Sequence, residues 1–258
     1  MPEFAELFGG LRAVSLDDLN ERAALQRRTD NKYLVPVEDL SGILGGLADR
    51  HDVLEIDGER VFDYESTYFD TPSLRCFHDH IEDRRPRFKA RTRCYVSTGD
   101  CFFEVKVKHE DGETTKRNVD HDPDTRAELA PAGRDLLGEA LPECGIEAPD
   151  DPTPSLVTAF RRVTVVARDR PERTTFDFEV RLCDPDGEAA RLDPGFAIAE
   201  TKTAEGDGLW DRALTDAGLE AVSLSKYRIG TGLVRAPGED AGYAADLKRL
   251  FEVDGRPG

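Results

Sequence analysis

Basic side chains recur at every second position in two short runs of this sequence. The runs are Lys89-x-Arg91-x-Arg93 in FKARTRCY and Glu104-x-Lys106-x-Lys108 in FFEVKVKH. Successive side chains of a β-strand point to opposite faces, so each run places its charged groups on one face. Phe103, Val105 and Val107 would form a buried layer on the other face. Guanidinium and ammonium groups suit phosphate oxygens, so the pattern predicts an internal anion site.

Other strand-like segments carry similar alternation, and we expect all these charged groups to face one enclosed lumen. Two unscreened cations about 6 Å apart repel by roughly 3 kcal/mol at an effective dielectric constant of about 20. Such a lumen would be strained when empty and relieved by a chain of phosphates. For any single run the alternative is a solvated outer face. The further inward candidates are Arg28, Asp30, Lys32, Lys116 or Arg117, Arg162, Arg173, Asp177, Glu179, Arg181, Glu200, Lys202, Lys226 and Arg228.

The carboxylates among these cations are candidates for a metal site. Mg²⁺ and Mn²⁺ prefer oxygen ligands and commonly use one or two carboxylates plus substrate phosphates. Glu200, in AIAETKT, is the first candidate, and its candidate helpers are Glu104, Asp30, Asp177 and Glu179. For Glu104 and Asp177, simple neutralisation of neighbouring Arg and Lys is an equal alternative.

The remaining patterns predict the elements that position these residues. Ser15 and Asp18 form a capping-box pattern that starts a helix over 15–27, and Pro36 starts a second helix. Three more helices are expected near 131–141, around Trp210 and over 238–253. Alternating runs predict strands over 28–35, 61–69, 87–96, 101–109, 113–120, 155–167, 173–182, 196–203 and 223–230.

These elements predict an α+β fold. We expect a closed antiparallel β-barrel of about eight strands with peripheral helices, because closure removes exposed strand edges. The expected organisation is an N-terminal helical segment over 1–27 and a barrel domain over 28–235. That domain would contain a helical, acidic insertion at about 121–154, and a C-terminal helix and tail would occupy 236–258.

The composition restricts the partners and the compartment. The 258 residues include 53 Asp and Glu against 35 Lys and Arg, a formal net charge of −18. Binding to a nucleic acid backbone requires a basic outer face, so this charge argues against it. No apolar run approaches the roughly 18 residues of a membrane helix, and the N-terminus lacks a signal pattern. We expect a cytoplasmic protein that reaches a membrane only through a partner.

Cysteine and histidine add no chemistry of their own. The five cysteines share no ligand-like spacing, and although Cys94 and Cys101 could approach across a hairpin, we expect free thiols. The five histidines show no triad or zinc spacing. His78-x-His80 is expected on a surface turn.

The order of the charged motifs resembles the VTC domain of polyphosphate polymerases, in the triphosphate tunnel metalloenzyme (CYTH-like) superfamily. The matching segments, from about Arg28 to Gly230, are R-x-D-x-KY, YFDT, RFKARTR, FEVKVK, T-x-D, ETK and SKYR. The resemblance implies a tunnel that binds ATP, triphosphate or polyphosphate with Mn²⁺ or Mg²⁺ and transfers the terminal phosphate of ATP to a polyphosphate chain. Glu200 would hold the metal. The implied main phosphate ligands are Lys32, Arg91, Arg93, Lys106, Arg162, Arg173 and Lys226, and the secondary ones are Arg28, Lys89, Lys108, Lys116, Arg181, Lys202 and Arg228.

Two departures from related sequences bear on the activity. Hydrolytic relatives begin with an E-x-E-x-K strand, whereas this chain has Arg28-x-Asp30-x-Lys32. A cation in place of the first carboxylate reduces the capacity to bind a second metal and activate water, which favours the polymerase. The eukaryotic polymerases also carry a phosphate-sensing region and membrane helices, so transport here would need a separate membrane protein. Two alternatives remain open: an inorganic or nucleoside triphosphatase, and a non-catalytic polyphosphate or nucleotide sensor of a membrane partner.

Overall fold

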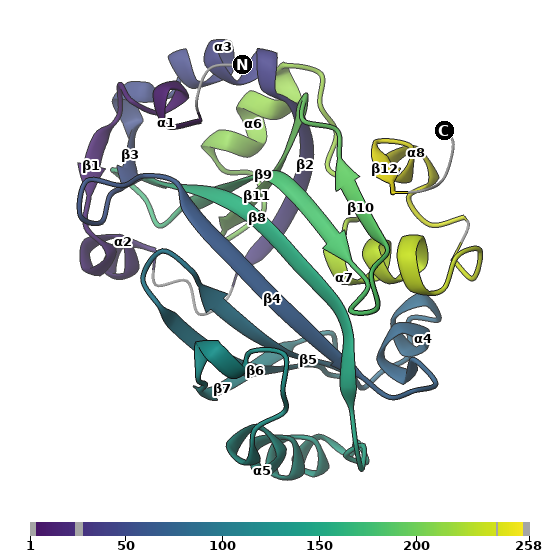
Figure 1. Cartoon of the computed structure of the whole chain (residues 1–258). Coiled ribbons are helices and arrows are strands. Elements are labelled where there is room, and N and C mark those ends of the chain that lie inside the picture. The colour runs from purple at the N-terminus through teal and green to yellow at the C-terminus, as the bar shows by residue number, and fades with distance from the viewer. Residues whose placement is uncertain (1–3, 24–27, 241, 255–258) are drawn as a thin grey trace. The chain divides into compact units, whose positions relative to one another are not determined.

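The computed structural model describes residues 4–23, 28–240 and 242–254 (Figure 1), and the chain divides into two compact units. Unit 1 comprises 1–62, 160–179 and 193–223, and unit 2 comprises 63–159, 180–192 and 224–258. Each unit combines segments that lie far apart in the sequence. The predicted division of the chain near residues 27 and 235 stays a prediction.

The strands form a 12-stranded sheet that is not closed, so the expected closed barrel of about eight strands is wrong. The main hydrogen-bonded order is β12-β10-β9-β8-β4-β5-β6-β7, with β11 pairing β9 and β2, and β3 pairing β8 and β1.

Within the described chain, β7 pairs only with β6. Residues 114–118 of β7 are all exposed and include two cations, which is how natural proteins protect an unpaired edge. The strands are β1 (Arg12–Val14), β2 (Thr29–Pro36), β3 (His51–Leu54), β4 (Phe62–Asp70), β5 (Arg87–Tyr95), β6 (Asp100–Lys108), β7 (Thr114–Asp120), β8 (Thr153–Ala167), β9 (Arg173–Cys183), β10 (Ala189–Leu192), β11 (Phe196–Thr203) and β12 (Phe251–Val253).

In unit 1, apolar alternation sets which face of the strands is buried. Val35, Phe176 and Ala199 lie in a core with Trp210, beneath helices α1 (Phe4–Leu7), α3 (Val37–Gly45) and α6 (Leu209–Asp216) (Figure 1). The Asp211 carboxylate of α6 accepts hydrogen bonds from side chains of Asn31, Tyr33 and Thr201 at 2.7–2.9 Å. This face of β2 and β11 is therefore committed to the core, and the intervening side chains project from the opposite face.

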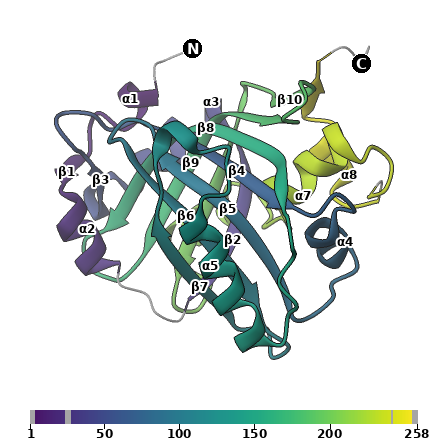
Figure 2. The same ribbon diagram turned by 60° about the horizontal axis from the view of Figure 1, so that its bottom comes forward.

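In unit 2, β4 to β7 form an antiparallel meander. Helix α5 (Pro131–Ala140) crosses β6 and β7 (Figure 2) and covers the face that carries Phe103, Val105 and Val107, all buried as predicted. The helix approaches so closely that a Cβ at Gly133 would meet the Phe103 ring at 3.1 Å. The charged side chains of β5 and β6 consequently occupy the other face.

Several predicted elements differ in type or length. The strand expected over 223–230 is wrong: helix α7 (Lys226–Gly230) forms there, because the Ser225 hydroxyl accepts from the Arg228 amide and caps it. His78 and His80 lie on helix α4 (Arg75–Ile81), not on a surface turn. The helix expected over 238–253 is reduced to α8 (Ala245–Lys248), followed by β12.

Other local predictions are confirmed. Ser15 caps helix α2 (Leu16–Arg22) by accepting from the Asp18 amide, although the last part of this predicted helix, 24–27, lies outside the described residues. The turn at 97–100 joins β5 to β6, where Cys94 and Cys101 face each other and form a disulfide. For this pair the expectation of free thiols is wrong. Across the described residues, no helix is both long and apolar enough to cross a bilayer.

Candidate functional site

Unit 2 gathers four charged side chains on the face of β5–β7 opposite α5, which we name the Glu104 cluster: Arg91, Arg93, Glu104 and Lys116. Arg91 lies directly across from Glu104 in the β5–β6 register, and two of its nitrogens contact one Glu104 oxygen at 2.8 Å. Lys116 of β7 pairs with the other oxygen, and Arg93 Nε lies 3.6 Å from Glu104. The sequence left Lys116 and Arg117 as alternatives. Arg117 points the other way, to Glu139 of α5.

Glu104 is the buried centre of this cluster, with a residue exposure of 3%. Burial alone would raise the pKa of its carboxyl group, but Arg91, Arg93 and Lys116 outweigh burial and lower the pKa to about 2. One carboxylate therefore stays ionised among three cations, which leaves a local excess of positive charge. Its ion pairs with Arg91, Arg93 and Lys116 are those that the neutralising role considered for Glu104 requires.

Tyr68, which the sequence reading did not select, belongs to the same site. Its hydroxyl accepts from Arg91 at 2.9 Å, and its ring stacks on Tyr227 of α7 at 4.9 Å. Burial would raise the pKa of the Tyr68 hydroxyl, but Arg91, Arg93 and Lys226 lower it overall. The Tyr227 hydroxyl in turn donates to the buried Asp70 carboxylate at 2.5 Å. These contacts of Tyr68, Tyr227 and Asp70 hold the Arg91 guanidinium in place. The only signal in the sequence was that Tyr68 shares the alternation of the YFDT strand.

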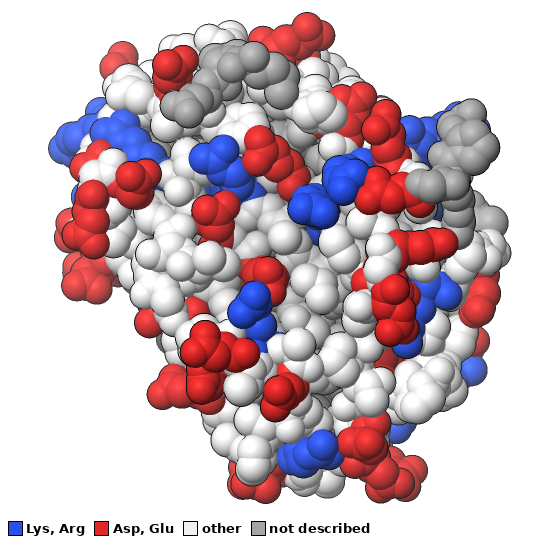
Figure 3. Space-filling model, viewed as in Figure 1, with Lys and Arg blue, Asp and Glu red and all other residues white. Residues whose placement is uncertain are grey.

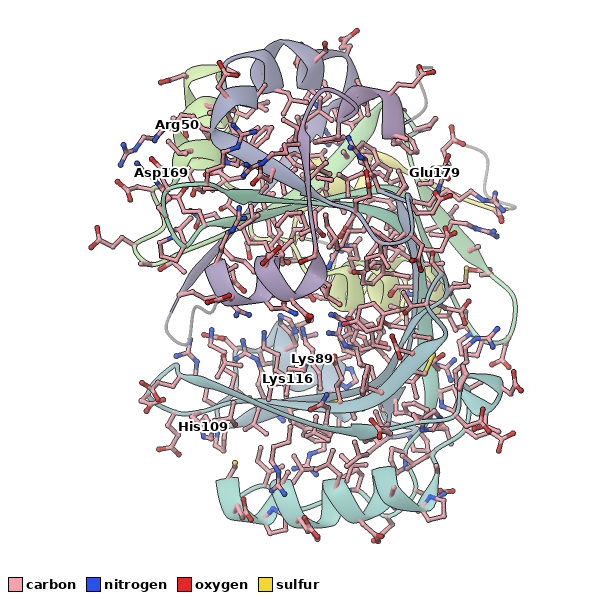
Figure 4. The ribbon with its side chains drawn as sticks, turned by 90° about the vertical axis from the view of Figure 1, so that its left-hand side faces the viewer. Arg50, Lys89, His109, Lys116, Asp169 and Glu179 are labelled. Atoms are coloured by element: carbon pink, nitrogen blue, oxygen red, sulfur yellow. A yellow bond between two sulfur atoms is a disulfide. The ribbon has the colours of Figure 1, made fainter. Side chains whose placement is uncertain are left out.

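The row of cations continues along β5 and β6 towards α7. Lys89 donates to the Ser225 hydroxyl at 3.1 Å and lies over the Tyr227 ring, and it faces Lys106 across the strands. Lys108 lies one step further, opposite Arg87. Figure 4 shows Lys89 and Lys116 projecting to the same side of the sheet, away from α5. The alternation predicted from the sequence is therefore confirmed for both runs.

Unit 1 contains a second group, which we name the Glu200 cluster: Asp30, Lys32, Glu200 and Lys202. The register of β2 and β11 pairs Glu200 with Lys32 and Lys202 with Asp30. Lys202 Nζ lies 2.6 Å from one Glu200 oxygen and 3.7 Å from Asp30, and Lys32 Nζ lies 3.4 Å from the other Glu200 oxygen. Burial would raise the pKa of Glu200, but Lys202, Lys32 and Arg162 hold it well below its usual value.

Arg162 and Arg173 flank this cluster on β8 and β9. Arg162 donates to both oxygens of the buried Asp177 at 2.5 and 2.8 Å, so Asp177 serves as its counter-ion. Arg173 lies opposite Lys202 in the register of β9 and β11. Burial lowers the pKa of Lys202 despite the neighbouring Glu200 and Asp30, and the nearby Arg162 guanidinium lowers it further.

Some predicted site residues lie elsewhere in their units or have other partners. Arg228 forms a two-pronged ion pair with Asp240 at 2.6 and 2.8 Å and stacks on Tyr243. Arg181 is exposed opposite Arg191 of β10. Arg28 lies beside Asp30, at 2.9 Å, and Lys226 is half-buried at the start of α7. Glu179, labelled in Figure 4, is exposed and lies 3.9 Å from Arg161. The structure does not bring Glu179 to Glu200.

The carboxylates described above suit a metal ion that takes most of its ligands from a bound substrate. Among the residues that the structure describes, no group of three or more His, Cys, Asp or Glu side chains could hold an ion. Glu200 is ionised, but both of its oxygens face ammonium groups. A divalent cation would therefore need phosphate oxygens for most of its ligands, which is the usual arrangement for Mg²⁺. That all these cations share one lumen stays a prediction.

Comparison with known proteins supplies the family. A Hippeastrum protein described as having a dominant triphosphatase activity has 17% identity over 82% of this chain and 99% of that chain, with a TM-score of 0.48. Two Pyrococcus horikoshii proteins have 16% and 14% identity over 75% and 78% of this chain and 94% and 93% of theirs, with TM-scores of 0.38 and 0.41. No curated protein sequence matches. Residues 27–235 match the VTC domain, and the chain therefore belongs to the VTC domain family.

Proposed function

We propose that this protein transfers the terminal phosphoryl group of ATP to a polyphosphate chain, with Mn²⁺ or Mg²⁺. Membership of the VTC domain family supports an activity on triphosphate or polyphosphate. The observation that carries the proposal is local charge. In a chain with a net charge of −18, the buried Glu104 carboxylate is outnumbered by the three cations around it, and the half-buried Glu200 faces two ammonium groups. On the face of the molecule that Figure 3 shows, acidic side chains are spread over the surface.

The chemistry of phosphoryl transfer matches what these side chains can do. An oxygen of the terminal phosphate of the acceptor attacks the γ-phosphorus of ATP, the bond to the β–γ bridging oxygen breaks, and ADP leaves. The attacking oxygen is already anionic, so no general base is needed. The protein has to position the phosphates and stabilise the charge of the transition state, which are the main contributions in this class of reaction. Arg91, Arg93, Lys32 and Arg162 have the fixed counter-ions that such positioning requires.

The residues of the Arg28-x-Asp30-x-Lys32 motif favour phosphoryl transfer over hydrolysis. Arg28 occupies the place of a carboxylate in the hydrolytic motif, and it donates to Asp30 at 2.9 Å. Asp30 also lies near Lys202, so this strand offers little to a second metal that would activate water. We assign Glu200 to the single divalent cation, which when bound would neutralise phosphate charge. Movement of the product across a membrane would be the task of a separate membrane protein.

A product assay with γ-labelled ATP tests the proposal. The protein is incubated with ATP and Mn²⁺ or Mg²⁺, with and without a short polyphosphate primer, and the products are separated on a gel. A ladder of labelled chains supports transfer. Labelled orthophosphate without a ladder would identify a triphosphatase, and unchanged ATP would identify a binding protein; either would overturn the polymerase.

Matched variants on the two faces of β5–β7 complete this assay. Arg91→Ala removes a guanidinium from the Glu104 cluster and should abolish the ladder. Arg117→Ala removes one from the opposite face, where its partners are exposed, and should leave the ladder intact. Equal losses in the two variants would show that the loss does not come from the proposed site.

A further inference from the structure

Three aromatic side chains lie at one end of the cation row of unit 2. Tyr95 is the next residue after Arg91 and Arg93 on the same face of β5, as the alternating burial of this strand shows. Phe102 of β6 lies opposite Arg93, and Tyr64 of β4 lies opposite Tyr95. A row of phosphate-binding groups thus runs directly into a group of aromatic rings.

The rings are arranged as a partly open platform. Tyr64 and Tyr95 meet edge to face with centroids 5.0 Å apart, and Tyr95 and Phe102 do so at 6.2 Å. Tyr95 and Phe102 are half-buried, whereas Tyr64, which lies beside Tyr95 on β4, is buried. Tyr68 and Tyr227 are a second aromatic pair on this face. Both are buried and their rings stack on each other, so the pair does not present a ring face to a ligand.

The spacing along β5 suits a nucleotide. A strand rises about 3.3 Å per residue, so Tyr95 lies about 7 Å beyond Arg93 and about 13 Å beyond Arg91. In a nucleoside triphosphate, a ribose and the first phosphates separate the base from the terminal phosphate. With the base at Tyr95, the phosphates would extend past Arg93 to Arg91, and the row beyond Arg91 continues with Lys89.

We propose that Tyr95 and Phe102 form a stacking platform for the nucleobase of the donor nucleoside triphosphate. The inference rests on the proposed function and deepens it, because it assigns the donor end of the row to Tyr95 and the polyphosphate end to Lys89, Lys106 and Lys108. Every base has a π-face, and stacking on aromatic rings is tolerant of sequence. The platform therefore distinguishes nucleotides from inorganic triphosphate but not one base from another.

Binding of two probes tests this platform. The affinities of the full chain for a non-hydrolysable ATP analogue and for inorganic tripolyphosphate are measured by calorimetry at the same salt and metal concentrations. Stacking contributes about 1–3 kcal/mol per base, which converts to a factor of about 5 to 140. Tyr95→Leu and Phe102→Leu should weaken the ATP analogue by a factor in this range and change tripolyphosphate binding less than twofold. Tyr95→Phe should retain both affinities.

The outcomes separate the two proposals. If the wild-type protein binds neither probe, the proposed function fails. If it binds both, and Tyr95→Leu weakens both equally or neither, the platform is wrong and the phosphate site stands. Val96→Ala, at an exposed position next to Tyr95, is the matched control and should leave both affinities unchanged. Thermal unfolding of each variant verifies that it is folded, and GTP in place of the ATP analogue should bind with similar affinity.

Discussion

Replacing Glu104 by glutamine removes the single negative charge among Arg91, Arg93 and Lys116 while preserving the shape of the side chain. The pKa of Glu104 is lowered from 4.5 to about 2, and each unit corresponds to about 1.4 kcal/mol. Glu104→Gln should therefore lower the free energy of unfolding by about 3 kcal/mol at pH 7. Removing one partner of a buried ion pair generally costs a similar amount, about 3–5 kcal/mol.

The pH dependence of this difference has a definite sign. The folded protein lowers the pKa of Glu104, so its stabilisation is complete above the unfolded value of 4.5 and is lost as the pH falls towards about 2. Glutamine cannot titrate. The difference between wild type and variant should therefore shrink by about 1.4 kcal/mol for each pH unit below 4.5.

The same variant should bind polyanions more tightly. Glu104 repels a bound phosphate, and at about 6 Å with an effective dielectric constant of about 20 this repulsion is roughly 3 kcal/mol. Glu104→Gln should thus increase the affinity for tripolyphosphate by tenfold or more, up to about 100-fold, and saturating tripolyphosphate should restore much of the lost stability.

Urea unfolding followed by circular dichroism, at pH 7 and pH 3.5 with and without tripolyphosphate, measures both effects. Glu139→Gln is the matched control, because Glu139 is an exposed partner of Arg117 on the other face of the sheet; its effect should stay below about 0.5 kcal/mol. If Glu104→Gln changes neither stability nor tripolyphosphate affinity, the Glu104 cluster is a solvated surface and the reasoning fails.

Three further predictions concern other parts of the chain. Glu200→Gln should reduce turnover at least 100-fold, yet retain tripolyphosphate binding in the presence of EDTA; normal turnover would remove the metal role. Arg162→Ala removes the guanidinium that is ion-paired with the buried Asp177 carboxylate, so the free energy of unfolding should fall by about 3–5 kcal/mol, as followed by urea titration, and an effect below 1 kcal/mol would contradict the pairing. Non-reducing mass spectrometry should find Cys94 and Cys101 protected from alkylation until a reductant is added, and labelling of both without reductant would refute the disulfide.

Much of the fold could be predicted because the alternation of apolar and charged residues in a strand depends only on residues that are close in the sequence. In β5 and β6 the apolar residues alternate with charged ones, and a side chain at every second position must lie on the same face. The same argument holds for Glu200 and Lys202 on β11. For these strands the period of two was enough to predict which side chains share a face, and the strand register confirms it.

Predictions that required long-range partners fared less well. SKYR alternates like a strand, but burial of Tyr227 against Tyr68 and capping by Ser225 stabilise a helix instead. Arg228 looked like a phosphate ligand, yet Asp240, twelve residues later, already holds it. Closure of the sheet could not be predicted either, since it depends on whether edge strands find each other and not on their own residues.

The sequence by itself determined which strand faces are cationic, because the two-residue period of a strand leaves no other arrangement once the apolar face is buried. Only the tertiary structure decided how those cations are balanced. The strand register brings Glu104 to Arg91 and Lys116, and Glu200 to Lys32 and Lys202. Coulombic interaction falls with distance and with solvent exposure, so only the packed chain can set the charge that a phosphate would meet.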